Sequence, residues 1–204
     1  MLVSEATRFL EEAYEVLNQT FFNNELSQVI ITIQSSPKSY GHYTPWNAWH
    51  ENQQGFREIN IAAETLNRPI GNVIATLQHE MVHHFCDQNG IKDTSRGSVY
   101  HNKRFQKEAE SRGLVLEYDG RIGFSITHPG MPLMDLINNM GWQNVNLARR
   151  GSSNSYNGSG GPNGSNGGDS DNDDNSGKKK SSTRKYICTQ CKCSVRATKE
   201  VNIA

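Results

Sequence analysis

The sequence of 204 residues has few cysteines, few apolar residues and no net charge, and each shortage excludes a class of protein. Three of its four cysteines lie close together near the C-terminus, which is not the pattern of a disulfide framework. No run of about 18 apolar residues occurs, as a membrane-spanning helix would require. The first residues, MLVSEATRFLEEAYEVL, lack the basic start of a signal peptide. We therefore expect an intracellular, cytoplasmic protein with no membrane partner.

Charge is balanced over the whole chain but not along it. Lys and Arg number 21, as do Asp and Glu, so the total argues neither for nor against nucleic acid as a partner. Residues 1–150 carry a net charge of −3, residues 151–177 of −4 and residues 178–204 of +7. In the middle stretch 25 of 27 residues are Gly, Ser, Asn or Asp, which cannot form a core. The sequence predicts a domain over 1–150, a disordered linker over 151–177 and a basic tail over 178–204.

Hydrophobic periodicity within the predicted domain indicates an α+β fold. Apolar side chains recur at helical spacing near the N-terminus, and short β-branched or alternating runs follow. Asn67 is a candidate N-cap for a long apolar helix, and Pro69 suits its first turn. The expected elements are a helix over 6–17, strands over 29–33 and 57–62, a helix from 70 to about 85, a loop over 89–100, a helix over 102–112 and a hairpin over 118–127.

The motif His79-Glu80-Met81-Val82-His83, within the long apolar helix, carries the strongest functional signal. Positions four apart on a helix project from one face, so His79 and His83 can occupy two positions of a tetrahedral zinc ion. Glu80 is turned by about 100° from His79 and lies beside the metal without binding it. This suits a base that takes a proton from a water activated by the metal. The alternative is a surface helix that merely carries two histidines.

A catalytic zinc ion needs a third protein ligand, and His101 is the best-placed candidate. It follows a loop of 17 residues after His83 and starts the next predicted helix, so the chain can fold back over the metal. Glu108 and Glu110 compete for this role, because some zinc peptidases take a glutamate from the following helix. The alternative interpretation of His101 is a solvated residue at a helix start.

Other residues near the motif have less specific interpretations. His84 is turned by about 100° from His83, away from the metal. Cys86 is more often a small buried apolar residue than a ligand. The aromatic run over 40–49 either lines a substrate groove or packs over the sheet. The candidates for stabilising an oxyanion are Tyr40, Tyr43 and Tyr118, among which the sequence does not choose.

These features together resemble the SprT-like zinc metallopeptidase family. The stretch LQHEMVHHF at 77–85 precedes a polar loop and a histidine, His101, with Phe105 four residues on. The segment FFNNEL at 21–26 and the stretch at 118–127 also resemble this family, so the match covers about residues 5–130.

The resemblance implies a small zincin-like metallopeptidase domain, with helices packed on a short mixed sheet. It implies that His79, His83 and His101 hold one catalytic Zn²⁺ and that Glu80 is the catalytic base. Spartan-type members cleave proteins crosslinked to DNA, so the implied partners are a protein substrate and single-stranded or crosslinked DNA.

The tail contains a CxxC motif that resembles the first half of the zinc ribbon carried by many family members. A tetrahedral structural site needs four ligands, but only Cys188, Cys191 and Cys193 are present and no Cys or His follows them. We expect an incomplete structural zinc site and no folded element in so short a segment. The basic tail is a candidate DNA contact or a solubilising terminus. The alternative basic cluster lies near His101 and comprises Arg96, Lys103, Arg104 and Lys107.

Two functions remain open on the sequence. The leading hypothesis is a monomeric zinc-dependent metallopeptidase associated with DNA. The alternative is a non-proteolytic, zinc-containing binding protein, either DNA-associated or a phage- or plasmid-type accessory protein. Glu80 favours the peptidase, because a purely structural zinc site has no need of a carboxylate beside its ligands.

Overall fold

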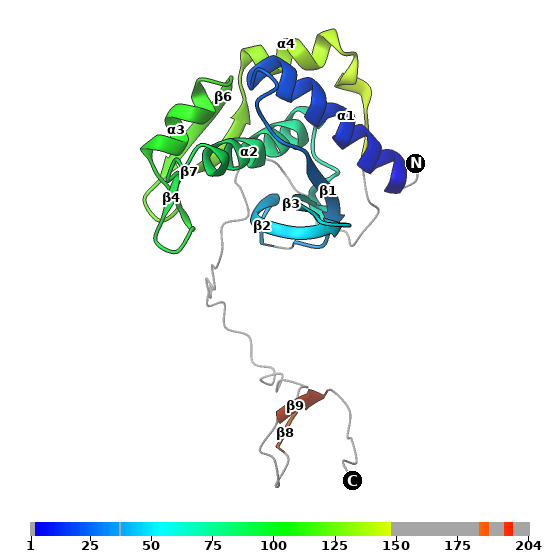
Figure 1. Ribbon diagram of the computed structural model, residues 1–204, viewed down its shortest axis with the longest axis vertical. Helices are drawn as coiled ribbons and strands as arrows, with labels where there is room; N and C mark the ends of the chain where they lie inside the picture. The colour runs from blue at the N-terminus through cyan, green and yellow to red at the C-terminus, as the bar shows by residue number, and fades with distance from the viewer. Residues whose placement is uncertain (1–2, 37, 148–183, 188–193, 198–204) are drawn as a thin grey trace, which may run out of the picture. The chain divides into compact units, whose positions relative to one another are not determined.

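The computed structural model describes residues 3–36, 38–147, 184–187 and 194–197 (Figure 1). Residues 3–147 contain four α-helices and two mixed β-sheets, which confirms the predicted α+β class. Contacts divide the chain into two compact units, Met1–Ser165 and Asn166–Ala204, and each is described by itself. The predicted linker over 151–177 and the three tail cysteines lie outside the described residues.

The first sheet has three strands in the order β1-β3-β2. The central strand β3 (Gln54–Ala62) pairs in parallel with β1 (Val29–Gln34) and antiparallel with β2 (Gly41–Glu51). Strands β1 and β3 confirm the prediction, whereas β2 was not predicted. Pro45 interrupts its sequence pattern, and an edge strand tolerates a residue without an amide hydrogen.

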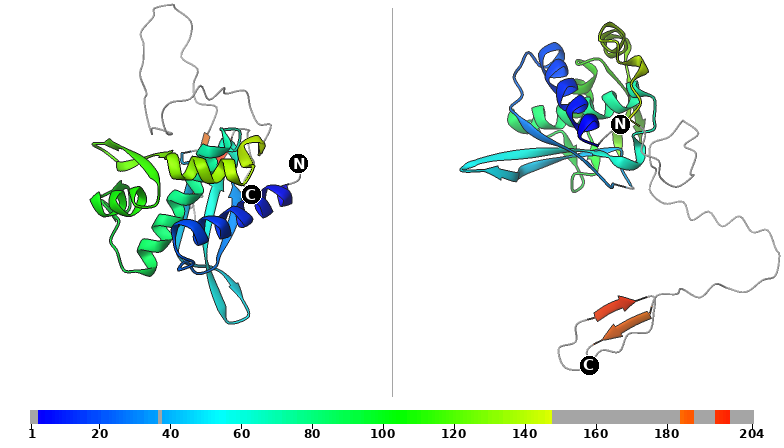
Figure 2. Two further views of the ribbon diagram at one scale, coloured as in Figure 1. Left: turned by 90° about the horizontal axis from the view of Figure 1, so that it is seen from above. Right: turned by 90° about the vertical axis from the view of Figure 1, so that its right-hand side faces the viewer.

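Helices α1 (Val3–Phe21) and α2 (Ile70–Gln88) pack against each other and cover one face of this sheet (Figures 1 and 2). The predicted first helix is confirmed, with an apolar stripe turned to the core. Helix α2 is buried on nearly all sides, as expected of an apolar helix at the centre of a domain. Its N-cap is Pro69, so the prediction that Asn67 caps this helix is wrong.

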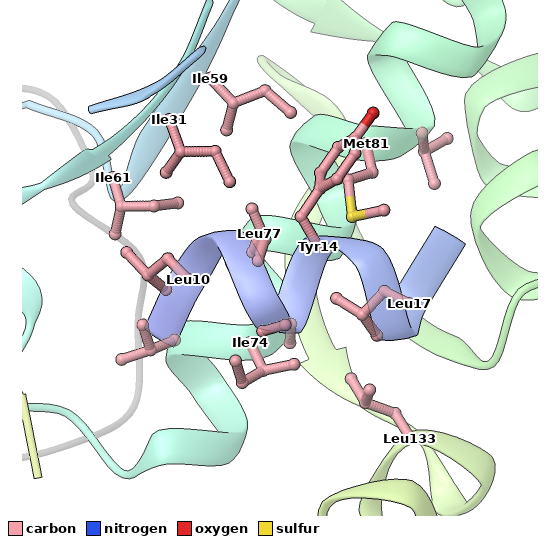
Figure 3. Packing of buried hydrophobic residues seen from close by; sticks show 14 of the residues in the cluster. Leu10, Tyr14, Leu17, Ile31, Ile59, Ile61, Ile74, Leu77, Met81 and Leu133 are labelled. Carbon is pink, nitrogen blue, oxygen red and sulfur yellow. The ribbon is translucent and has the colours of Figure 1, made fainter. Parts of the chain in front are cut away.

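Side chains from these elements meet in one hydrophobic core (Figure 3). Burial of each large aliphatic side chain contributes about 1.5–3 kcal/mol to folding. The core fixes the rotation of α2 about its axis, and this rotation determines which face presents His79 and His83. The residues labelled in Figure 3 are Leu10, Tyr14, Leu17, Ile31, Ile59, Ile61, Ile74, Leu77, Met81 and Leu133.

The second sheet has four strands in the order β4-β5-β7-β6, whose two long members form the predicted hairpin. These are β6 (Leu114–Asp119) and β7 (Gly123–Pro129). The other two, β4 (Thr94–Ser95) and β5 (Tyr100–His101), have only two residues each; β4 and Tyr100 lie where a loop was predicted, and His101 lies at the predicted start of a helix. A strand of two residues is too short for a periodic pattern, which explains the difference.

The helix after β5 begins later than predicted. Helix α3 (Lys103–Glu110) has Asn102 as its N-cap, and the side-chain oxygen of Asn102 accepts a hydrogen bond from the backbone N–H of Arg104 at 2.7 Å. His101 therefore lies on a strand, and the prediction that it starts the helix is wrong.

Helix α4 (Met131–Asn139) and the 3₁₀ helix η2 (Trp142–Asn144) follow β7, and another 3₁₀ turn, η1 (Ala63–Thr65), follows β3. Sequence analysis predicted none of the three. Among the helices of the described segments, none has both the length and the apolar composition needed to cross a membrane.

In the second unit, strands β8 (Arg184–Ile187) and β9 (Ser194–Ala197) form an antiparallel pair on either side of the stretch that holds the tail cysteines. Sequence analysis expected no folded element in this tail. Strand pairing uses backbone amides and carbonyls, so it does not depend on a complete set of metal ligands.

Candidate metal centre

Three histidines from two elements converge at one point. His79 and His83 lie one turn apart on α2, and His101 lies on β5. The Nε2 atom of His83 lies 3.2 Å from that of His79 and 3.0 Å from that of His101, and the third distance is 3.2 Å. Zn–N bonds of 2.0–2.1 Å in a tetrahedron place neighbouring nitrogens about 3.3 Å apart. The triangle therefore fits one face of a tetrahedron, and the three side chains are close enough to bind a metal ion.

Hydrogen bonds at Nδ1 hold two of these rings in the tautomer that leaves Nε2 without a proton. His83 Nδ1 lies 2.5 Å from the carboxylate of Asp93, which only accepts, so the histidine donates. His79 Nδ1 lies 2.7 Å from the hydroxyl of Thr127, which donates its own proton to the Ser125 carbonyl, so this ring also donates. Both Nε2 lone pairs therefore face the centre of the triangle, as metal ligation requires.

Burial favours the neutral, metal-binding form of two of the imidazoles, those of His79 and His101. Desolvation, followed by the proximity of His83 and His101, lowers the pKa of His79 well below its ordinary value. Desolvation and the proximity of His83 lower the pKa of His101 to about 4, although the backbone of Ile122 opposes this shift. Neither ring needs to lose a proton before it binds a metal at neutral pH.

Phe105 packs against all three imidazoles. Its ring centroid lies 4.6 Å from those of His79 and His83 and 4.7 Å from that of His101. The side chain is fully buried, so it closes one side of the cluster to water.

Glu80 is a buried carboxylate beside this cluster, and strand β2 runs directly past it. Burial raises the pKa of Glu80 to about 7, while His83 and the backbone N–H of Tyr43 oppose the rise. A Cβ atom at Gly41 would lie 3.3 Å from Glu80 Oε1 and 2.8 Å from the Asn60 carbonyl oxygen. The absence of a side chain at Gly41 therefore lets the edge strand approach the carboxylate.

A single pair of residues brings His101 to the site. Strand β5 pairs with β7 only between His101 and Gly123, and the His101 N–H donates to the Ile122 carbonyl at 2.9 Å. Gly123 has φ of +71°, and a Cβ there would lie 2.0 Å from the His101 carbonyl oxygen. Only glycine allows this approach.

The structure places the competing ligand candidates elsewhere. Glu108 binds Arg112 at 2.7 Å, and Glu110 accepts a hydrogen bond from Gln106 at 2.9 Å. Neither carboxylate belongs to the group of side chains close enough to hold a metal.

His84 and Cys86 are also separate from the cluster. The His84 ring lies 3.2 Å from both Ser27 Oγ and Tyr43 Oη, and burial lowers its pKa. Cys86 is fully buried, and burial raises the pKa of its thiol to about 12, as expected of a residue that fills space.

The three tyrosines considered for oxyanion stabilisation make the following contacts. The hydroxyl of Tyr43 donates to Asp87 at 2.7 Å, and the Tyr118 hydroxyl accepts from Tyr100 at 3.2 Å. The Tyr40 ring lies under the guanidinium of Arg68. Their catalytic role stays a prediction.

The aromatic run over 40–49 is partly packed and partly exposed, and its role in a substrate groove stays a prediction. Tyr43 packs against the core, whereas Trp46 and Trp49, farther along β2, keep 67% and 44% of their surface exposed.

Sequence analysis missed Asp93 and Thr127, which orient two of the histidines. The sequence contains only a weak signal for Asp93 as the partner of His83, because Asp87 is another acidic residue shortly after His83. Only the fold of the loop shows which carboxylate reaches the ring, while Asp87 instead pairs with Arg57 at 2.9 Å.

Comparison of the chain with protein-family models, with curated proteins and with solved structures finds no match. The interpretation of the site rests on its own geometry and on the sequence motif.

Proposed function

We propose that this chain is a zinc-dependent metallopeptidase of the SprT-like type, with a zincin-like domain that hydrolyses peptide bonds. The observation that carries the proposal is the buried carboxylate of Glu80 beside three histidines whose Nε2 atoms converge. A structural site needs no such group, whereas hydrolysis needs a base next to the metal.

The donor set suits zinc in a catalytic role. Three neutral imidazoles are ligands that zinc accepts in tetrahedral geometry, and three protein ligands leave the fourth position open. When bound, zinc supplies Lewis acidity that activates water near neutral pH and polarises a peptide carbonyl.

Glu80 takes the proton from the attacking water and transfers it to the nitrogen of the leaving amine. A base whose pKa lies near the working pH performs both transfers well, and burial raises the pKa of Glu80 to about 7. The N–H of Tyr43 holds the carboxylate on the side of β2.

The position of β2 supports a protein substrate. It is an edge strand of its sheet, and Glu80 lies beside it. An extended peptide can add to such an edge through main-chain hydrogen bonds, which places its carbonyl groups near the histidines. Association with DNA through the basic tail follows from the resemblance and remains part of the proposal.

Replacement of Glu80 by glutamine tests the proposal. The Glu80→Gln variant should keep one zinc per chain, because the histidines are unchanged. Its rate of casein cleavage should fall by about 10²–10⁴-fold, because an amide cannot accept the proton. Metal analysis and a casein assay on the full chain measure both quantities.

The matched control is Glu108→Gln, in which the altered carboxylate pairs with Arg112 away from the cluster. This variant should cleave casein like the parent chain. A Glu80→Gln variant as active as the parent would refute the mechanism and favour the non-proteolytic zinc protein.

A further inference from the structure

An open groove with a cavity volume of about 720 Å³ lies next to the candidate metal centre. Two of its lining residues, Tyr100 and Asn102, flank His101 in the sequence. The lining combines the cationic side chains of Lys92, Lys103 and Arg104 with the aromatic side chains of Tyr100, Tyr118 and Phe124.

The positive charge of this groove is not neutralised by its neighbours. Within residues 3–36 and 38–147, Lys92, Lys103 and Arg104 form no ion pair. The nearby carboxylate of Asp93 accepts a hydrogen bond from His83, and that of Asp119 accepts from the backbone at the β6–β7 turn. The three cations are therefore available to an anionic ligand.

Two of these cations occupy a position that helix electrostatics disfavour. Lys103 and Arg104 lie in the first turn of α3, which contains no acidic residue. The positive end of a helix dipole lies at this turn, so it favours anions and repels cations. A bound anion would interact favourably with the helix terminus and with both side chains.

Aromatic rings also line this groove, and that of Tyr118 is exposed while those of Tyr100 and Phe124 are half-buried. Tyr118 keeps 60% of its surface exposed, and its ring centroid lies 5.1 Å from that of Phe124. The Tyr100 hydroxyl donates to that of Tyr118, and the guanidinium of Arg96 lies 4.4 Å from the centre of the Tyr100 ring. Aromatic faces beside cations are the features with which proteins bind unpaired bases and their phosphates.

We propose that this groove binds single-stranded nucleic acid. The phosphates contact Lys92, Lys103 and Arg104, and bases stack on Tyr118 and Phe124. An acidic peptide would use the cations but would have no need of the aromatic rings that line the groove, so these rings favour nucleic acid. This site is distinct from the basic tail, and it goes beyond the proposed peptidase activity and does not depend on it.

Binding of labelled oligonucleotides to the full chain tests the proposal. Fluorescence anisotropy with oligo(dT) and oligo(U) is measured over a range of salt concentrations. Replacement of Tyr118 by alanine should weaken binding by about 5–100-fold, whereas Tyr118→Phe, which keeps the ring, should bind like the parent. The logarithm of the association constant falls as the logarithm of the salt concentration rises, and the double variant Lys103→Gln with Arg104→Gln should make this slope less steep by about 1.4.

A charge-matched control replaces two exposed cations that do not line the groove, Arg8→Gln with Lys38→Gln, and should leave binding unchanged. A preference for either oligo(dT) or oligo(U), lost in Tyr118→Ala, supports the proposal and identifies the nucleic acid.

Two results would overturn the proposal. In one, all variants bind like the parent, which would place the contacts outside the groove. In the other, polyglutamate competes as well as the oligonucleotides do and Tyr118→Ala has no effect, which would make the groove an acidic-peptide site. Hydrolysis is not measured, so neither result bears on the peptidase proposal.

Discussion

At the scale of single residues, the orientation of each imidazole matters as much as its presence. His83 can present Nε2 to a metal only if Nδ1 keeps its proton, and the carboxylate of Asp93 fixes that proton at 2.5 Å. Thr127 does the same for His79. Asp93 and Thr127 therefore orient the two imidazoles for metal binding in the absence of a metal ion.

We therefore expect Asp93→Asn to weaken zinc binding by about 10–100-fold without loss of the fold, because a neutral amide holds the His83 ring less firmly. Competition with a chromophoric zinc chelator measures the affinity. The matched control is Asp135→Asn, which changes an exposed residue of α4. Equal affinities for the two variants would show that Asp93 does not orient the ligand.

At the scale of secondary-structure elements, the third histidine depends on a short strand. Strand β5 has two residues and pairs with β7 at one position, where Gly123 adopts a left-handed conformation. The close contact of the two backbones therefore fixes the distance between His101 and α2.

The substitution Gly123→Ala should push β5 away, because the new Cβ would overlap the carbonyl oxygen of His101. We expect a loss of zinc affinity of about tenfold or more, approaching that of His101→Ala. Gly120→Ala in the same hairpin is the control, since a Cβ there meets nothing within 4 Å. Tight zinc binding by Gly123→Ala would mean that β5 holds its place without this glycine.

Elements with a long periodic pattern could be predicted from the sequence, and short ones could not. Helices α1 and α2 show their apolar faces over 19 residues each, so the common face of His79 and His83 followed directly. His101 was placed at the cluster from the length of the loop, although the local structure predicted for it was wrong. Strand β5 depends on pairing with a segment 22 residues away, and the roles of Asp93 and Thr127 likewise depend on contacts between segments distant in the sequence.

At the scale of the whole molecule, the described core lies within one stretch of the chain. Its buried members run from Ala6 to Leu147, and α2 contacts both sheets and the other three helices of residues 3–147. The stability of this unit should therefore depend on residues before the predicted linker.

We expect deletion of residues 151–204 to leave the melting temperature within about 2 °C of the full chain and zinc binding unchanged. Differential scanning calorimetry and metal analysis of the two proteins measure this. A clearly lower melting temperature for the shortened chain would indicate that residues after 150 pack on the core.

The position of the histidines on two elements also bears on local unfolding. A bound ion would join α2 to β5 and close the intervening chain into a loop. This link lowers the conformational entropy of any locally unfolded state of the loop, so it disfavours opening of the loop. Without the ion, β4 and β5 are held by a few backbone hydrogen bonds and by side-chain contacts such as that of Asp93 with His83. Chelation should therefore speed amide exchange over residues 92–102 and leave α2 protected, because the loop can detach while the core stays folded. Equal protection of this loop with and without metal, measured by hydrogen exchange, would contradict this coupling. A metal ion bound by the three histidines would therefore also keep the wall of the neighbouring groove ordered.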